Sequence, residues 1–306
     1  MRLRAQPGDI VLRSLAWGFA AIIVALAVAL GLGLCVDSRL AWLNFGPAFI
    51  VTGVWDPVTE VFGALPFIYG TLVSSLLALS IAVPLGLGSA IFLAELAPKK
   101  LADACAFSIE ILAAVPSVVL GLIGIFVLLP TVRAVEPFLD RYLGFIPLFK
   151  GEPYGVGMLS AGIILALMVL PYITSMSREV LLSVPRPLKE GVLALGATRW
   201  EMVRLVSLPY ARSGILGSVF LASGRALGET MAVTMVIGNA PKISASLLDP
   251  AYSMAAVIAN ELAEATSDLH VHSLVAIGLV LFAVTALVNG LAQLLIRRLS
   301  AAQGRA

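Results

Sequence analysis

Two charged residues, Arg225 and Glu229, lie four residues apart inside an apolar stretch that runs over residues 213–238. A charged side chain at the centre of a bilayer costs roughly 2.5–3.5 kcal/mol on insertion scales, so such residues usually serve a function. The spacing predicts that both side chains share one helical face. We therefore expect Arg225 and Glu229 to lie where a transported molecule passes. The structural alternative is a static buried ion pair that fixes helix packing.

The rest of the chain has the composition of a membrane protein, because 60% of its residues are hydrophobic and 12% are charged. An α-helix needs about 20 apolar residues to cross about 30 Å of hydrocarbon. Runs of that length without acidic residues, lysine or arginine cover residues 14–36, 61–94, 111–132, 153–177 and 269–296. Runs this long and uniform are typical of helices and not of barrel strands. Together with 213–238, they predict an all-α, polytopic transmembrane helical bundle of six spans.

The basic residues indicate how this bundle is oriented. With six spans both chain ends lie on one side of the membrane, and most basic residues fall on that side: Arg2, Arg4, Arg13, Lys99, Lys100, Arg178, Arg186, Lys189, Arg199, Arg204, Arg212, Arg297, Arg298 and Arg305. The other side carries Arg39, Arg133, Arg141, Lys150 and Lys242. Because loops rich in lysine and arginine stay in the cytoplasm, we expect both termini there.

Helix breakers and small residues indicate where the spans bend and pack. Pro84, Pro116 and Pro171 interrupt the second, third and fourth runs, which indicates either a cavity or moving part, or simple packing kinks. Gly224 and Gly228 flank Arg225 at a spacing of four residues. This small-xxx-small pattern predicts close helix packing at the depth of the charge.

A long polar loop on the cytoplasmic side covers residues 178–212. Pro185, Pro187 and Pro209 bound an amphipathic segment that we predict to be a helical hairpin over residues 188–206, with its break at Gly196. Amphipathicity alone leaves two possibilities open. Such an element lies on the membrane surface, or it inserts into a groove of a partner protein.

One motif in this loop resembles the EAA signature of ABC importer permeases. Glu190-Gly191-Val192, then Gly196, then Val206-Ser207-Leu208-Pro209 keep the spacing of that signature, although Gly191 and Val192 replace its two alanines. The resemblance implies a coupling helix that docks on a separate ATPase through Glu190, Gly196, Leu208 and Pro209. No G-x-x-x-x-G-K-[ST] motif occurs, so the chain has no ATPase motif of its own.

Further motifs are similar to the permease subunits of phosphate-specific ABC importers. They lie in order at residues 95–98, 114–119, 196–200, 211–215, 224–233 and 238–241. The resemblance implies the type I ABC importer permease fold over residues 67–296, with 178–212 as the coupling loop. An N-terminal span and periplasmic loop (1–66) precede it, and a cytoplasmic tail (297–306) follows.

The resemblance also implies partners and a location, and the chemistry of the residues themselves suggests roles for the central charges. It implies a protein of the bacterial inner (plasma) membrane. The implied partners are membrane lipid, a second phosphate permease subunit, a cytoplasmic ATPase dimer and a periplasmic phosphate-binding protein. No nucleic acid is implied. The chain would bind no cofactor, and ATP would be used by the ATPase. Arg225 would contact phosphate in transit, since a guanidinium pairs well with oxyanions. Glu229 would hold Arg225 when no anion is present.

Three other functions remain open from the sequence. The cargo could be another oxyanion, molybdate or sulfate. An autonomous anion channel would leave the Glu190 loop unexplained. An intramembrane enzyme would need catalytic His, Asp or metal ligands within the spans, but the runs contain no Asp, and their histidines, His270 and His272, lie at the very start of the last run.

Polar residues near the last span carry weaker signals. His270 and His272 are two residues apart and so point to different helix faces, which favours a solvated juxtamembrane pair and no metal site. Asp249, Glu261, Glu264 and Asp268 make the preceding loop acidic. Such a loop is either a solvated face or a docking surface for the binding protein.

Overall fold

The fold is that of a helical membrane protein in a computed structural model, which describes residues 7–303 and the side chains of residues 11–298. Six helical runs are long and apolar enough to cross a membrane: Val11–Asp37, Leu65–Leu96, Ser117–Leu143, Met158–Leu182, Arg199–Gly228 and Asp268–Arg298. The prediction of an all-α bundle with six spans is confirmed. Arg2, Arg4 and Arg305, which contribute to the charge pattern, lie outside the described residues.

Each span corresponds to one or more named elements. The spans are α1 (Pro7–Asp37), α4 (Leu65–Ile91) with a π-helical turn (Phe92–Leu96), α6 (Ser117–Ile123) with a π-helical turn (Gly124–Leu128) and α7 (Leu129–Leu143), α8 (Met158–Leu182), α10 (Arg199–Met202) with a π-helical turn (Val203–Ser207) and α11 (Leu208–Gly228), and α14 (Asp268–Gln303). The elements between them are α2 (Arg39–Phe45), α3 (Ala48–Val51), α5 (Lys99–Ala113), a 3-10 turn (Pro147–Phe149), α9 (Arg186–Ala194), α12 (Met231–Thr234) and α13 (Met254–Glu261). One antiparallel hairpin, β1 (Trp55–Asp56) and β2 (Val61–Phe62), completes the described chain.

The third span begins later than its apolar run suggested. The run starts at residue 111, but α5 ends at Ala113 and a new helix starts after Pro116, which has an extended backbone. Proline disfavours helical geometry in the residue before it, so Val115 ends the helical path. Pro84 and Pro171 behave differently, because α4 and α8 both continue through them.

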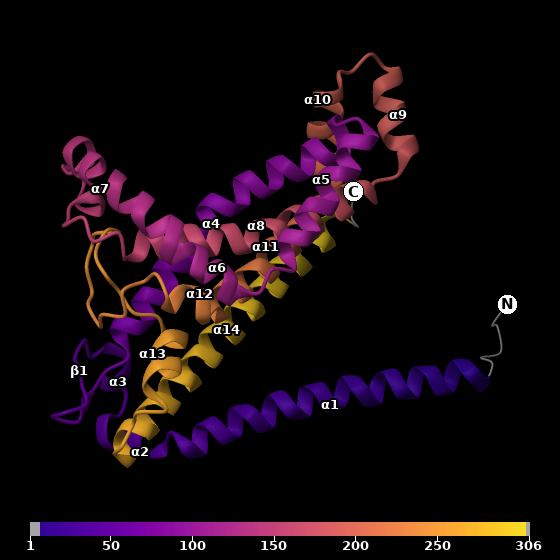
Figure 1. Cartoon of the computed structure of the whole chain (residues 1–306). Helices are drawn as coiled ribbons and strands as arrows, with labels where there is room; N and C mark the ends of the chain where they lie inside the picture. The colour runs from indigo at the N-terminus through magenta and orange to yellow at the C-terminus, as the bar shows by residue number, and fades with distance from the viewer. Residues whose placement is uncertain (1–6, 304–306) are drawn as a thin grey trace.

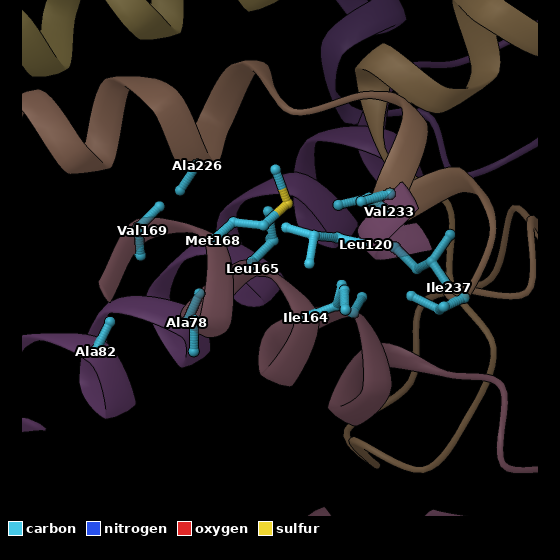
Figure 2. Close-up of a cluster of buried hydrophobic side chains, with 14 of the residues drawn as sticks. Ala78, Ala82, Leu120, Ile164, Leu165, Met168, Val169, Ala226, Val233 and Ile237 are labelled. Carbon is cyan, nitrogen blue, oxygen red and sulfur yellow. The ribbon is translucent and has the colours of Figure 1, made fainter. Parts of the chain in front are cut away.

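Helix α8 forms the centre of the bundle, since two thirds of its most apolar window (67%) is buried. It packs against α4 where glycines allow close approach. Gly86 of α4 lies against Ile173 of α8, and Gly162 of α8 lies against Leu77 of α4. Figure 2 shows the resulting core, in which side chains of α4, α8 and α11 meet: Ala78, Ala82, Ile164, Leu165, Met168, Val169 and Ala226.

Helix α1 stands apart from this bundle (Figure 1), and its side chains from Val11 to Leu30 are exposed. It contacts the rest of the described chain near its C-terminal end, where Gly31 approaches Phe282 and Leu34 approaches Gly278 of α14. Its apolar surface is therefore left for lipid or for another subunit.

The two ends of the bundle differ in what they carry. Helices α9 and α10 lie at one end, toward which the start of α1 and the last turns of α14 also run (Figure 1). The β1–β2 hairpin, α2 and the outer part of α7 lie at the other end. Both ends of the described chain therefore lie on the same side as the α9–α10 hairpin, as an even number of spans requires.

The close packing of α4 against the loop before α13 predicts a large effect for one glycine substitution. A Cβ atom on Gly70 would clash with the backbone carbonyl of Tyr252, whereas one on Gly88 of the same helix meets no described atom within 4 Å. We expect Gly70→Ala to lower stability by about 1–3 kcal/mol, because backbone cannot move aside cheaply. Gly88→Ala should be neutral or stabilising by up to about 1 kcal/mol, because alanine favours a helix. Thermal unfolding of the two purified variants tests this, and equal melting temperatures would contradict it.

Candidate functional site

Arg225 lies in the last turn of α11, and the helix ends three residues later at Gly228. The next residue, Glu229, has an extended backbone with φ −72° and ψ 127°. The prediction that a single helix runs through residues 213–238 and places Arg225 and Glu229 on one face is therefore wrong. The helix stops between the two residues, so the spacing of four no longer brings their side chains together.

Glu229 has a different partner from the one expected. Its carboxylate Oε1 accepts a hydrogen bond of 3.4 Å from the backbone N–H of Ala232, at the start of the short helix α12. Among the ion pairs formed by residues 11–298, none includes Arg225 or Glu229. A carboxylate near the first N–H groups of a helix is stabilised there, which explains why Glu229 turns toward α12.

The guanidinium group of Arg225 lies over an aromatic ring. Its Cζ atom is 4.4 Å from the centroid of the Tyr172 ring, and its Nε atom is buried without a hydrogen-bond partner. Tyr172 lies near the middle of α8. Arg225 is therefore deep in the bundle, although it lies in the last turn of its own helix. The free carbonyl groups at the end of α11 also favour a cation there.

Helices α8 and α11 are held in register on the side of this contact that faces the α9–α10 hairpin. The hydroxyl groups of Ser177 and Ser218 form a buried hydrogen bond of 2.8 Å. One turn further on, Gly214 allows α11 to approach Val180 of α8 closely. This pairing fixes where the Arg225 side chain meets α8.

The packing role of Gly224 and Gly228 stays a prediction, and within the described chain the two glycines differ in what they face. A Cβ atom on Gly224 would make ordinary contact with Asn289 of α14 at 3.6 Å, so this glycine faces a helix without unusual closeness. Gly228 has no described atom within 4 Å of that position. The close approach on α11 occurs at Gly214 instead, because that residue faces the central helix.

The predicted hairpin of the cytoplasmic loop is present but is not bounded as expected. Helix α9 ends at Ala194, and Gly196 turns the chain with a φ of +90°, a conformation that favours glycine. The chain then continues from α10 through a π-helical turn into α11 without a break at Pro209. Proline lacks an N–H and crowds the preceding turn, and the wider π-helical turn accommodates it. The second arm of the hairpin is therefore the start of the fifth span.

The residues of the EAA-like motif divide into exposed and anchored positions. Glu190 and Gly196 are exposed, as are the neighbouring Leu195 (88%) and Trp200 (56%). Leu208 instead packs against a buried cluster at the base of the hairpin. Exposed apolar side chains at the tip of a well-anchored hairpin are typical of a docking surface.

One buried ion pair at the base of this hairpin was not predicted. Lys189 of α9 donates to the Glu95 carboxylate at 2.7 Å, and the side chains are only 14% and 5% exposed. Its Nζ also donates to the carbonyl of Leu181 at the end of α8. The sequence does place both residues at the predicted cytoplasmic ends of elements. It does not indicate that they meet, because 94 positions separate them. The pair ties α9 to the second and fourth spans.

At the opposite end, His270 is buried, which contradicts the expectation of a solvated His pair. Its Nε2 lies 3.1 Å from the Glu261 carboxylate, which also accepts from the Trp55 indole at 2.9 Å. The imidazole stacks on Phe62. His272 instead contacts the backbone carbonyl of Asp37. Among the described residues no group of three or more His, Cys, Asp or Glu side chains could hold a metal ion.

The acidic loop at this end is solvated only in part. Asp249 accepts a 3.0 Å hydrogen bond from Lys242. Burial alone would raise the pKa of the Asp249 carboxyl. Hydrogen bonds from Ser244 and Lys242 outweigh this effect and hold the pKa of Asp249 below its usual value. Glu264 and Asp268 are exposed. Glu261 and Glu264 line an open hollow of about 560 Å³ together with Glu60 and His270.

Comparison with known proteins identifies the class to which this arrangement belongs. Residues 82–301 match the family described as binding-protein-dependent transport system inner membrane component. The chain belongs to this family: it is a multi-pass permease component of a binding-protein-dependent transporter in the inner membrane, and it is not itself an ATPase. Membership implies an ATPase and a binding protein as partners.

Within that family the chain groups with the PstC permeases. The phosphate transport system permease protein PstC of Mesorhizobium japonicum is 47% identical over 290 residues, which cover 93% of this chain and 89% of the relative. PstC of Xylella fastidiosa is 44% identical over 307 residues, which cover 99% and 94%. PstC 1 of Mycobacterium tuberculosis is 40% identical over 266 residues, which cover 84% and 79%.

Solved structures agree on the fold. The chain is similar to a structure of the inward-facing MetNI methionine ABC transporter, with a TM-score of 0.52 and 20% identity over 78% of this chain and 94% of that chain. The architecture is thus that of an ABC importer permease.

The Lys189–Glu95 pair predicts a specific pattern of stabilities. Lys189→Met would leave the Glu95 carboxylate buried and unpaired, which costs about 3–5 kcal/mol for pairs of this kind. Lys99→Met, at an exposed lysine at the start of α5, should have little effect. The charge swap Lys189→Glu with Glu95→Lys should recover part of the loss. Thermal unfolding of the assembled transporter measures all three, and equal behaviour of Lys189→Met and Lys99→Met would contradict the role of the pair.

Proposed function

We propose that this chain is the permease subunit of an ATP-driven importer that moves inorganic phosphate into the cytoplasm. Two facts support the proposal. The curated relatives that cover most of the chain are phosphate transport system permease proteins, and Arg225 is a deep cation with no carboxylate partner among the described residues. The second observation is the one that supports Arg225 as the anion-binding residue, because an arginine already neutralised by a carboxylate would not attract an anion.

The chemistry of Arg225 suits phosphate. At neutral pH inorganic phosphate is a mono- or dianion, and a guanidinium group binds its oxygens through paired hydrogen bonds. The helix break at Gly228 places this cation beside non-helical backbone deep in the bundle. In transporters, interrupted helices at this depth commonly form the substrate path.

Glu229 contributes to the same path from the other side of the break. Its half-buried carboxylate accepts from the N–H of Ala232 at 3.4 Å, a long hydrogen bond that can be exchanged. When no anion is present, a small movement of the segment after Gly228 would bring Glu229 to Arg225. Release of Glu229 as phosphate arrives would then keep the site from trapping its cargo.

The α9–α10 hairpin is the proposed contact with the ATPase. Glu190 and Gly196 lie on its exposed part, where they would dock in a cleft of a PstB-like ATPase dimer. Leu208 and Pro209 connect this hairpin directly to α11. Closure of the ATPase on ATP would therefore move the same helix that carries Arg225, which is the coupling that alternating access requires. ATP is used by the ATPase, and this chain binds no cofactor.

The remaining partners follow from the surfaces at each end and along the side. A second, PstA-like permease subunit would complete the channel, and the exposed apolar α1 would face lipid or that subunit. The acidic hollow around Glu261 and Glu264 would receive basic residues of a periplasmic PstS-like phosphate-binding protein. With the basic α9–α10 end inside, both termini are cytoplasmic.

The division of the chain follows the same assignment. Residues 1–66 form the N-terminal span and the periplasmic loop with its β hairpin, and residues 67–296 form the permease domain with its coupling loop at 178–212. The cytoplasmic tail, 297–306, begins as helix, since α14 continues to Gln303.

The nearest competing cargo is another oxyanion, sulfate or molybdate. Arg225 recognises negative charge and oxygen geometry that all three anions share. Specificity in this proposal therefore comes largely from the binding protein, and the relatives favour phosphate.

Removal of the central charge tests the proposal. We expect Arg225→Gln to abolish ATP-dependent uptake of labelled phosphate, because glutamine keeps hydrogen bonding but lacks the positive charge. The assay uses proteoliposomes that contain this chain with its permease, ATPase and binding-protein partners, with sulfate and molybdate as competitors. Arg297→Gln removes an equal charge at an exposed position of α14 and should leave uptake intact.

The other outcomes separate the alternatives. Normal phosphate uptake by an assembled Arg225→Gln transporter would exclude Arg225 as the contact. Failure of this variant to assemble would assign Arg225 a structural role. Flux without ATP would indicate a channel. If sulfate or molybdate is taken up in preference to phosphate, that anion and not phosphate is the cargo.

A further inference from the structure

A neutral aromatic ring, and not a carboxylate, holds the guanidinium group of Arg225. The Cζ atom lies 4.4 Å from the centroid of the Tyr172 ring. The Nε atom is buried without a hydrogen bond, and the ion pairs within residues 11–298 do not include Arg225. A permanently charged group is thus kept deep in the bundle by the electron-rich face of the ring, an attraction that grows when water is excluded.

A ring and a carboxylate hold a guanidinium in different ways. A carboxylate lies in the plane of the group and occupies two of its N–H donors. A ring packs against the flat face, so the donors, which point outward in the plane, stay available. While the Glu229 carboxylate stays on the Ala232 N–H, as in this structure, an arriving oxyanion can therefore pair with Arg225 without first displacing a bound negative charge. The Tyr172 contact stabilises the cation and keeps it competent to bind an anion.

The ring itself is placed by rigid surroundings. Tyr172 follows Pro171 in α8, and its other neighbour, Ile173, is fully buried against Gly86 of α4, where an added Cβ atom would lie only 2.9 Å from the Ile173 side chain. The Ser177–Ser218 hydrogen bond fixes α8 relative to α11 about one and a half turns away. The ring therefore cannot follow Arg225 if that side chain moves, and it acts as a fixed platform.

We propose that Tyr172 is a positioning residue for anion transport: its ring orients the Arg225 guanidinium so that its N–H donors face the passing oxyanion. This inference rests on the proposed role of Arg225 in the anion path. The ring face carries the effect and the hydroxyl does not, since no hydrogen bond of the described chain involves the Tyr172 hydroxyl.

Substitutions at position 172 separate the ring from the rest of the side chain. In the complete transporter, Tyr172→Leu should lower the maximal rate of ATP-dependent phosphate uptake about tenfold, because leucine fills space without a cation-binding face. Tyr172→Phe keeps the ring and should stay within about threefold of the unsubstituted chain. The phosphate concentration for half-maximal uptake should change little in either variant, since capture by the binding protein precedes this step.

A matched control comes from the surface of α7. Tyr142 also lies near an arginine, with the Cζ of Arg141 at 6.0 Å from its ring, but Tyr142 is exposed. Tyr142→Leu should leave the uptake rate unchanged. Tyr172→Leu in an Arg225→Gln background should cause no further loss, because the ring has then no cation to orient.

Fluorinated phenylalanines at position 172 give a readout that packing alone does not move. Successive fluorine atoms weaken the negative face of the ring while its shape stays nearly the same. The uptake rate should fall stepwise with fluorine number, while assembly and thermal stability remain constant. This series also decides the matter if Tyr172→Leu fails to assemble.

Two results would overturn the inference. If Tyr172→Phe loses as much uptake as Tyr172→Leu, the hydroxyl and not the ring is required. If uptake does not respond to fluorination, the ring only fills space. Failure of the proposed function looks different: the unsubstituted transporter then takes up sulfate or molybdate in place of phosphate, and the same series measured with that anion still tests Tyr172.

Discussion

The packing of α8 between α4 and α11 is the interaction on which the other features depend. Glycines at positions 86 and 162 let α8 and α4 approach closely, and the Ser177–Ser218 hydroxyl pair sets the register between α8 and α11. Without hydrophobic attraction between helices inside lipid, small residues and polar pairs of this kind supply the contacts that hold spans together. The position of Tyr172 under Arg225 follows from that register.

The end of α11 at Gly228 is the second determining feature. In lipid a helix cannot simply stop, because its last carbonyl groups would lack hydrogen bonds. Here the chain after the break folds back into the bundle, and Val233, Val236 and Ile237 are buried in the same core as α8. Protein therefore packs against the segment that follows the break, although Gly228 itself is exposed, and an arginine can lie in the last turn where the helix dipole favours it. A continuous helix would have left Arg225 paired with Glu229 and neutralised.

The two ends of the molecule are connected to this centre by buried polar contacts. On the hairpin side, the Lys189–Glu95 pair joins α9 to the end of the second span. At the opposite end of the bundle, Glu261 joins α13 to Trp55 of the β1–β2 hairpin and to His270 of α14. Such contacts lose much of their energy if one partner moves away, since the group left behind remains buried. These buried contacts therefore tie the elements at each end of the molecule to one another.

The sequence by itself determined the number of spans, the amphipathic hairpin and the identity of the isolated deep cation. Length and apolarity decide whether a segment crosses a bilayer, and an arginine such as Arg225 stands out wherever its neighbours are apolar. The tertiary structure alone decided which groups meet that cation. Glu229 is four residues from Arg225 but is turned away by a helix end that packing created, whereas Tyr172, 53 positions away, lies beneath it. The burial of His270 and the Lys189–Glu95 pair could not be predicted from the sequence for the same reason. Spacing along the chain predicts neighbours only within a continuous helix, whereas contacts between helices depend on how their surfaces pack.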